Sequence, residues 1–585
     1  MESKVQEKIS DKEQQNVAGE GAFIHDVAAV SSIGHDISSI DIFAQSQLAQ
    51  TLEKPIPCLF HALPLFAVEQ RKNDLYIILS QVISQLIEQL SLTQKQLSET
   101  SLFLGSSSLD IVNVQSDENK AIWLNTLDKI NLYLVEKFKL SALHFTFNTA
   151  CTSSSNALIY ANRLLKSKQI KYALVVGCEF YNELTLRGFM SLELLSDRAL
   201  FAFSQQRDGM VLGEGVGALF LSKQAKVNNS KPLLQVLDGY SSCDTYSLTS
   251  TQEDGNKIAE VINSALELSK LTIEDIDVVK VHGTASPASD QAEAQALKSL
   301  AIVEKKLFAL KPFIGHTLGA CGALELALLV QLIKLNKIPV SEYMTEHELI
   351  LPILSTPISF ENVNYILANH CGFGGNNAAI VLKKLSNEVN SDCRKKQLIA
   401  HKMNRDIKLS RLAQHQLVIS NDIPTKAVRK QVKQVTGFEV RRMDNFTLIA
   451  LQAIYEMITE LKTGYELQGR TFHLNQYNLG LYGVADYFSV ELLQSLVVDC
   501  ERDEEVRPLD FISTVGNAAN FYIAKQFKVN GVNIFTGASE HALENISSLA
   551  GYDLSHDIVD LAIIVHWQQQ ANSLKCSTQL MVNKH

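Results

Sequence analysis

The chain has 585 residues, enough for two to four domains of ordinary size. Hydrophobic residues make up 46% of it and charged residues 20%, the balance of a soluble globular protein. With 53 basic against 63 acidic residues, the net charge of −10 argues against a general nucleic-acid binder, although it leaves room for a local basic patch that meets an acidic carrier protein.

Nine cysteines are spread over the chain without a CxxC pair, which argues against a zinc ribbon, another metal site or a disulfide framework. Free thiols predict a reducing compartment, the cytoplasm. No stretch of about 20 apolar residues is present, so no membrane span is expected. Residues 1–21 are polar and highly charged and lack the apolar core of a signal peptide, which predicts a disordered lead-in.

Residues 22–385 read as an α/β unit. The short apolar runs KYALVVGCE (171–179) and IDVVKVHG (276–283) are typical of buried strands. Helical periodicity marks LYIILSQVISQLIEQL (75–90) and GALELALLVQLIKL (322–335). This alternation predicts sheets that are covered by helices on both faces.

The composition changes after residue 385. Residues 386–430 begin polar and charge-rich without a clear period, which predicts a linker, and a second α/β unit is expected over 431–585. Its predicted elements are a helix at 445–461, a strand at 479–485, a helix near 517–527 and a strand at 531–537.

The second unit resembles part of the first. When the chain is shifted by 389 positions (520 − 131), residues 131–151 lie on 520–540 without a gap. Cys151 then falls opposite Glu540. Chance similarity between two helix–strand units is the alternative to a true repeat. Four pairs are identical in this register: Asn131/Asn520, Tyr133/Tyr522, Phe138/Phe527 and Lys139/Lys528.

Cys151 stands between a strand end at 145–148 and a predicted helix at 153–167. A cysteine at the start of a helix feels the positive end of the helix dipole, which lowers the thiol pKa and favours a nucleophilic thiolate. The local sequence fits equally well with a small buried thiol that only packs.

Two histidines further along the chain, His282 and His316, each lie at a predicted turn. His282 ends a buried strand, where sites in α/β folds are built, and Asp290 and Glu293 come just before a helix that they could simply cap. His316 stands in a Gly-His-Thr turn before another predicted helix, with Lys311 upstream and Glu325 downstream.

The fourth motif is GFGGNN (372–377), a permissive glycine-rich turn that precedes a strand. It lacks both the spacing and the lysine of a P-loop, which argues against nucleotide binding.

TACTSSSNAL, RDGMVLGEGVGALFL, HGTASPASD, KPFIGHTLGACGALE and GFGGNN occur in the order and rough spacing of the β-ketoacyl-acyl-carrier-protein synthases. This resemblance covers about residues 22–385 and implies a thiolase-like, five-layered αβαβα ketosynthase. Two departures are HGTAS in place of HGTGT and a segment before Cys151 that is shorter by a few tens of residues.

The resemblance implies a Cys-His-His triad and no cofactor or metal. Cys151 matches the nucleophile, His282 and His316 match the two histidines, and Phe373 matches the gatekeeper at the oxyanion hole. Further residues are expected to support them: Lys311, Glu325, Thr284, Asp290 and Gly374. The implied substrates are acyl and malonyl thioesters on an acyl carrier protein, joined by decarboxylative condensation, and the family implies a homodimer.

Residues 431–585 resemble the N-terminal half of a ketosynthase without its GHT and GFGG motifs. We therefore expect an inactive, truncated chain-length-factor-like domain that either shapes the pocket or only shields a surface. The fused architecture resembles the condensing enzyme of prodigiosin-type bipyrrole assembly, which uses a pyrrolyl thioester. Aryl-polyene and fatty-acid synthases are the nearest alternatives, followed by a non-catalytic scaffold and a degradative thiolase, which needs a second cysteine as base.

Overall fold

A computed structural model gives the structure of the chain. It describes residues 21–34, 50–52, 58–63, 74–111, 126–340, 348–385, 409–441, 443–487, 490–502, 505–538 and 540–583. Except for Gly21, the predicted lead-in lies outside these residues. Within them, no helix is long and apolar enough to cross a membrane.

One sheet of 15 strands runs through both units. In spatial order the strands are β11 (Lys306–Phe308), β10 (Val278–Lys280), β12 (Tyr365–Cys371), β13 (Asn376–Lys384), β9 (Leu234–Cys243), β1 (Ala22–Ser31), β8 (Gly215–Ser222), β6 (Tyr172–Glu179), β4 (Thr100–Gly105), β5 (Phe145–Phe147), β16 (Asn533–Gly537), β15 (Leu479–Ala485), β17 (Leu561–Gln569), β18 (Ser573–Asn583) and β14 (Leu409–Ser420). A second, small sheet holds β2 (Gln50–Leu52), β3 (Cys58–His61) and β7 (Leu212–Gly213).

The helices confirm most of the predicted spans. In the first unit they are α2 (Asp74–Leu90), α3 (Gln94–Ser98), α5 (Lys129–Phe138), α6 (Ser153–Lys166), α7 (Glu183–Ser191), α8 (Asn256–Leu268), α9 (Pro287–Ser299), α10 (Lys311–Ile314) and α11 (Cys321–Lys334). In the second they are α12 (Thr425–Thr436), α13 (Asn445–Glu466), α14 (Val490–Glu501), α15 (Pro508–Ile512), α16 (Asn517–Phe527) and α17 (Ala542–Ser555).

The first unit has five layers. Helix α2 covers β1 and β8, while α6 and α11 lie on the opposite face of this part of the sheet. On the far side of α6 come β9 and β13, which α8 covers from outside, with α9 packed beside α8. All of α11 is buried except Gln331 and Lys334, as expected of an apolar helix that is covered on all sides. The predicted αβαβα architecture is therefore present.

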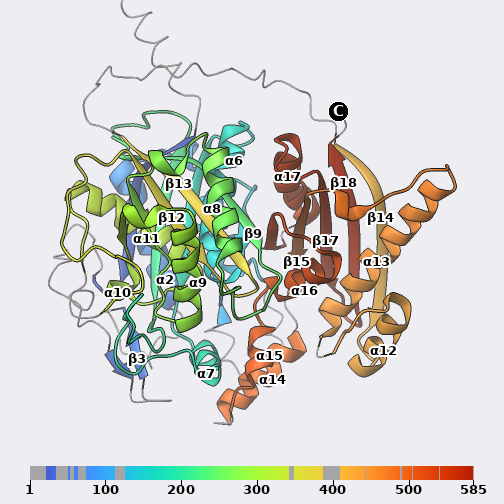
Figure 1. The fold of residues 1–585 in the computed structure, drawn as a ribbon. Helices are drawn as coiled ribbons and strands as arrows, with labels where there is room; N and C mark the ends of the chain where they lie inside the picture. Colours follow the sequence, from blue (N-terminus) through green and yellow to red (C-terminus); the bar gives the residue numbers. More distant parts are fainter. Residues whose placement is uncertain are drawn as a thin grey trace, which may run out of the picture.

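The second unit repeats half of the first. Its strand order β14-β18-β17-β15-β16 has the same sequence of antiparallel and parallel pairings as β1-β8-β6-β4-β5. The two units stand side by side, the second coloured orange to red in Figure 1. This common topology supports a true repeat over a chance similarity.

The predicted linker is too long. Residues 386–408 lie outside the described part, but β14 (409–420) lies within the expected 386–430, and α12 (425–436) begins within it. Strand β14 was missed because only one edge of it is paired, with β18, and its partly polar sequence shows no buried run. The second unit therefore begins before residue 431.

Equivalent strands of the two units pair across their junction. Phe147 of β5 lies antiparallel to Thr536 of β16, its own counterpart in the 389-residue shift, so the units are related by a local two-fold axis. Asn131 donates from Nδ2 to the Phe145 carbonyl at 2.8 Å, and Asn520 donates in the same way to Ile534 at 2.8 Å. Two of the matched residues thus perform the same structural task in each copy.

A buried polar cluster also joins the units. Asp553 of α17 accepts hydrogen bonds from Arg163 Nη1 at 2.6 Å, Tyr160 Oη at 2.5 Å and Tyr482 Oη at 2.6 Å. Arg163 and Tyr160 belong to α6, the helix that follows Cys151. Because all four side chains are buried, separating the units would leave a charge without its partner.

Candidate active site

Cys151 lies in a 3₁₀ turn, Ala150–Thr152, between β5 and α6, and it is 5% exposed. Ala150 has a positive φ of 50°, which a non-glycine residue adopts only where its surroundings hold it. Ser153 does so: its Oγ accepts from the Thr149 N–H at 2.9 Å and donates to the Ala150 carbonyl at 2.6 Å. The backbone is therefore fixed on both sides of the thiol.

The expected depressed pKa of Cys151 is wrong. Burial raises the pKa of this thiol to about 12, and the nearby Cys321 raises it further, while Lys311 and a hydrogen bond from the Phe373 backbone N–H lower it. Loss of hydration therefore outweighs the favourable position at the helix start. At rest Cys151 is therefore a thiol, which must lose its proton before the sulfur can act as a nucleophile.

His282 is held by its backbone. Its N–H donates to Glu293 Oε1 at 2.7 Å, and the next N–H, of Gly283, donates to Oε2 at 2.9 Å. Asp290 Oδ1 accepts from the N–H of Thr284 at 2.9 Å and from that of the following residue at 3.1 Å. The two carboxylates at the start of α9 thus fasten the turn after β10 rather than only capping the helix.

His316 faces His282, with ring centroids 5.4 Å apart and planes at 88°. Burial, followed by the charge of Lys311, lowers the pKa of both imidazoles well below the usual value. Both rings are therefore neutral at pH 7. Each neutral ring carries one N–H to donate and one lone pair to accept.

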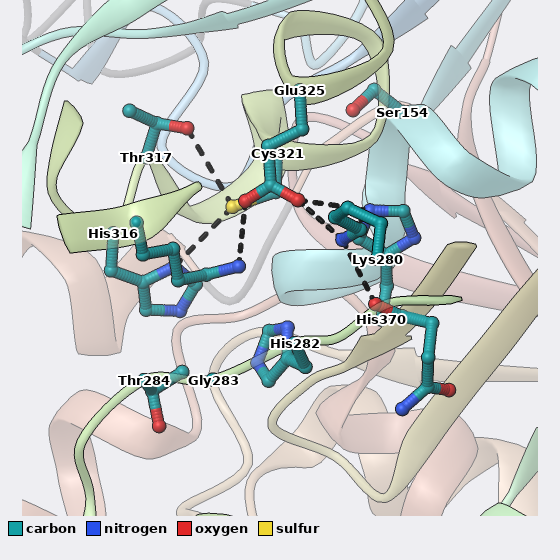
Figure 2. A network of polar contacts seen from close by, with 12 residues as sticks. Ser154, Lys280, His282, Gly283, Thr284, His316, Thr317, Cys321, Glu325 and His370 are labelled. Carbon is teal, nitrogen blue, oxygen red and sulfur yellow. Dashed lines mark hydrogen bonds and ion pairs between the residues drawn. The ribbon is translucent and has the colours of Figure 1, made fainter. Parts of the chain in front are cut away.

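The predicted Lys311–Glu325 pair is present, with Nζ 2.7 Å from Oε1, and it belongs to a larger buried cluster that Figure 2 shows. Lys280 donates to the other oxygen of Glu325 and to the Asn369 carbonyl at 3.0 Å, and its Nζ lies 2.8 Å from His370 Nε2. Sequence reasoning missed Lys280 and His370. A lysine inside the apolar strand VVKV was a usable signal, because a buried lysine requires an anionic partner.

The glycine-rich turn receives support from the second unit. Asn517, at the start of α16, donates from Nδ2 to the Phe373 carbonyl at 3.0 Å. Gly374 has φ +73°, and a Cβ there would lie 2.3 Å from Asn517 Nδ2. The glycine is therefore required both by its own conformation and by the contact between units.

Two chambers meet at Cys151. The wider one, with an empty volume of about 880 Å³, is lined by Cys151, His282, His316, Thr284 and Phe373 among others. The narrower one, of about 600 Å³, is largely apolar, and part of its wall comes from the second unit. The residues contributed by the second unit are Leu493, Phe511, Ile512, Thr514 and Val515.

Aromatic rings link the two walls of the narrower chamber. Phe189 of α7 stacks on Phe373 with centroids 5.2 Å apart and meets Phe511 edge-on at 5.5 Å. A Cβ on Gly188 would lie 2.2 Å from the Phe511 ring, so the second unit packs closely against α7. No sequence motif marks Phe511, because its position depends on the packing between the units.

The site brings together all the triad and supporting residues that the sequence singled out. It also contains Cys321, whose Sγ is 3.3 Å from His316 Nδ1. Among the described residues, no group of His, Cys, Asp or Glu is arranged to hold a metal ion.

Two family models match the chain: "Beta-ketoacyl synthase, N-terminal domain" over residues 68–226 and "Beta-ketoacyl synthase, C-terminal domain" over 234–343. A 3-oxoacyl-[acyl-carrier-protein] synthase homolog of Saccharomyces cerevisiae is 30% identical over 267 residues, which are 42% of this chain and 60% of the relative. A 3-oxoacyl-[acyl-carrier-protein] synthase 2 of Synechocystis is 31% identical over 250 residues, 40% of this chain and 60% of the relative. The chain thus spans about 60% of the length of these curated relatives.

Solved structures share the fold. The ketosynthase ApeO in complex with its chain length factor ApeC, from Xenorhabdus doucetiae, has a TM-score of 0.55 at 21% identity and covers 63% of this chain and 98% of its own. The PfaC keto synthase-chain length factor has a TM-score of 0.73 at 13% identity over 96% of this chain and 78% of its own. Residues 68–226 and 234–343 are therefore similar to the two domains of β-ketoacyl synthases, and the chain has a thiolase-like ketosynthase fold.

Proposed function

We propose that this protein is a β-ketoacyl-acyl-carrier-protein synthase that joins an acyl group on Cys151 to a malonyl unit by decarboxylative Claisen condensation. The observation that carries the proposal is the wider chamber, where the thiol meets His282, His316 and the backbone N–H of Phe373. Both curated relatives are named for this reaction.

In the loading step, the Cys151 sulfur attacks the thioester carbonyl of an acyl carrier. The backbone N–H groups of Cys151 and Phe373 stabilise the tetrahedral oxyanion. Collapse expels the carrier's thiolate, which takes up the proton released by Cys151, and leaves an acyl-enzyme. Lys311 supports the developing thiolate, because its charge lowers the pKa of Cys151.

In the condensation step, a malonyl thioester loses its carboxylate as carbon dioxide and leaves an enolate. The ring N–H groups of the buried His282 and His316 donate to the enolate oxygen. The α-carbon attacks the acyl carbonyl, and the Cys151 thiolate departs and regains a proton. The product is a 3-oxoacyl thioester on the carrier.

We propose that the second unit is an inactive, chain-length-factor-like partner over about residues 409–585 that shapes the acyl pocket. Its residues line the narrower chamber, and three phenylalanine rings offer flat apolar faces there. A planar acyl group such as a pyrrolyl unit of prodigiosin-type assembly suits these faces. The linear or polyene acyl groups of fatty-acid and aryl-polyene synthases are the alternatives.

The homodimer implied by the family remains a proposal and needs a surface other than β5. Strand β16 of the same chain already pairs with β5. A dimer of this chain would therefore be built from two complete pairs of units, and light scattering of the purified protein measures its mass.

The experiment that tests the function is a condensation assay with acyl- and malonyl-carrier thioesters. We expect Cys151→Ala to reduce product formation by at least about 1,000-fold, as loss of a catalytic nucleophile does. His282→Ala and His316→Ala should lose activity while retaining acyl loading. Product formation by Cys151→Ala at the wild-type rate would contradict the proposed role of Cys151, whereas no product from the wild type would indicate a scaffold without its own chemistry.

A further inference from the structure

A second thiol, Cys321, lies beside the catalytic histidines. It is the first residue of α11 and is 0% exposed. Among the described residues that line the two chambers, Cys321 does not occur. It therefore cannot act on a substrate as the second cysteine of a degradative thiolase does, and any influence on the reaction must pass through a neighbour.

That neighbour is His316. The Cys321 Sγ lies 3.3 Å from His316 Nδ1 and 3.6 Å from Thr317 Oγ1, as the dashed lines of Figure 2 show. Burial raises the pKa of Cys321 to about 11, although Lys311 lowers it. The sulfur is therefore protonated at neutral pH and has one S–H to donate.

The hydroxyl of Thr317 determines which atoms donate in the two hydrogen bonds of Cys321. This side chain is fully buried, and within the described part of the molecule its Oγ1 has Cys321 Sγ as its one hydrogen-bond partner. The hydroxyl must therefore donate to sulfur, or its own proton would be buried without an acceptor. The S–H is then left to donate to His316 Nδ1.

We propose that Cys321 is a positioning residue that fixes the tautomer of His316. When Nδ1 accepts the S–H, the single proton of the neutral imidazole is on Nε2. This nitrogen is the one that remains to donate to the thioester or enolate oxygen. The inference rests on the proposed condensation for its kinetic consequence, but not for the tautomer itself.

His282 provides a contrast within the same site. Its Nδ1 is buried and has no hydrogen-bond partner among the described residues. Lys311, Glu325, Lys280 and His370 act on His316 through their charges, Cys321 and His282 contact its ring, and Cys151 lines the same chamber. Of these, only Cys321 is hydrogen-bonded to the His316 ring in the part of the chain that the structure describes.

The test combines the ¹⁵N spectrum of labelled histidine with kinetics. His316→Ala identifies the His316 signals, and Cys576→Ala, which removes another fully buried thiol in β18, is the matched control. We expect the wild type and Cys576→Ala to carry the His316 proton on Nε2, whereas Cys321→Ala should shift part of it to Nδ1. Cys321→Ser, which keeps a donor, should restore the wild-type spectrum.

The kinetic readout is the condensation rate. Cys321→Ala should lower kcat by about 10- to 100-fold with KM within about twofold, as loss of a group that orients a catalytic residue does, and Cys321→Ser should recover most of the loss. A wild-type His316 protonated on Nδ1, or the same tautomer in Cys321→Ala, would overturn the inference. If the tautomer shifts but the wild type does not condense substrates, the inference stands and the proposed function fails.

Discussion

The two units of this chain share a half-fold and differ in chemistry. Strand order, pairing directions and the Asn131 and Asn520 hydrogen bonds are the same in both. Lys139 and Lys528 both end their helices with a positive φ, of 51° and 57°. The residues that remain alike are therefore those that hold a helix against a strand.

The two units differ at the position of the proposed nucleophile. Cys151 is buried in a tight turn, whereas Glu540, its counterpart, is exposed in the turn before α17. Among the described residues, the second unit also has no counterpart of the half from β9 to β13 that carries His282, His316 and the glycine-rich turn. The second unit thus lacks these residues and still provides a sheet edge and a pocket wall.

The largest expected effect comes from breaking the junction between the units. Asp553→Ala removes the closest anionic partner of the buried Arg163, at 2.6 Å, and leaves Asp238 at 3.8 Å, which should lower the free energy of unfolding by about 3–5 kcal/mol. Urea denaturation measures this, and Asp422→Ala, at an exposed turn, should change it by no more than about 0.5 kcal/mol. Equal unfolding midpoints for Asp553→Ala and the wild type would show that the cluster does not hold the units together.

The wall of the narrower chamber can show whether the second unit shapes the acyl pocket. Phe511→Ala removes a ring from the narrower chamber, so loading of an acyl group too large for the wild type should rise about tenfold. The control is Leu509→Ala, on the same helix but 50% exposed, which should leave selectivity unchanged. An unaltered acyl preference in Phe511→Ala would indicate that the second unit only shields a surface.

The raised pKa of Cys151 can be tested by its reaction with iodoacetamide between pH 7 and 10. The thiolate fraction of a group with a pKa of about 12 increases about tenfold per pH unit throughout this range. The alkylation rate, followed by peptide mass, should therefore climb without a plateau. A plateau near neutral pH would mean that the helix dipole lowers the pKa of Cys151 by more than burial raises it.

The smallest effect is expected from restoring the sulfur to the second unit. Glu540→Cys in a Cys151→Ala background should remain unable to load an acyl group, because the described part of the second unit holds no counterparts of His282 and His316 and residue 540 is exposed. Stability should change by less than about 0.5 kcal/mol, as at other surface positions. Acyl transfer to residue 540 would show that the second unit retains chemistry.

Much of the fold was predictable because buried strands and helices have distinct periodicities. The predicted strand 479–485 and helix 517–527 match β15 and α16 residue for residue. Strand β14 was not predictable, because its pairing with β18 joins residues more than 150 positions apart.

In the site, too, local motifs were predictable from the sequence and long-range contacts were not. Motifs located Cys151, His282 and His316, since each stands in a characteristic turn. Lys280 reaches Glu325 only through the packing of β10 against α11, 45 residues further along the chain. Phe511 enters the pocket only because the second unit docks on the first. The error in the Cys151 pKa has the same origin, since burial depends on the complete fold.

The most direct test of the central claim is the intact mass of the protein after incubation with an acyl-carrier thioester. The account predicts a gain of one acyl group on the wild type and none on Cys151→Ala. An acyl adduct that persists in Cys151→Ala, or none on the wild type across a panel of acyl- and pyrrolyl-carrier thioesters, would contradict it.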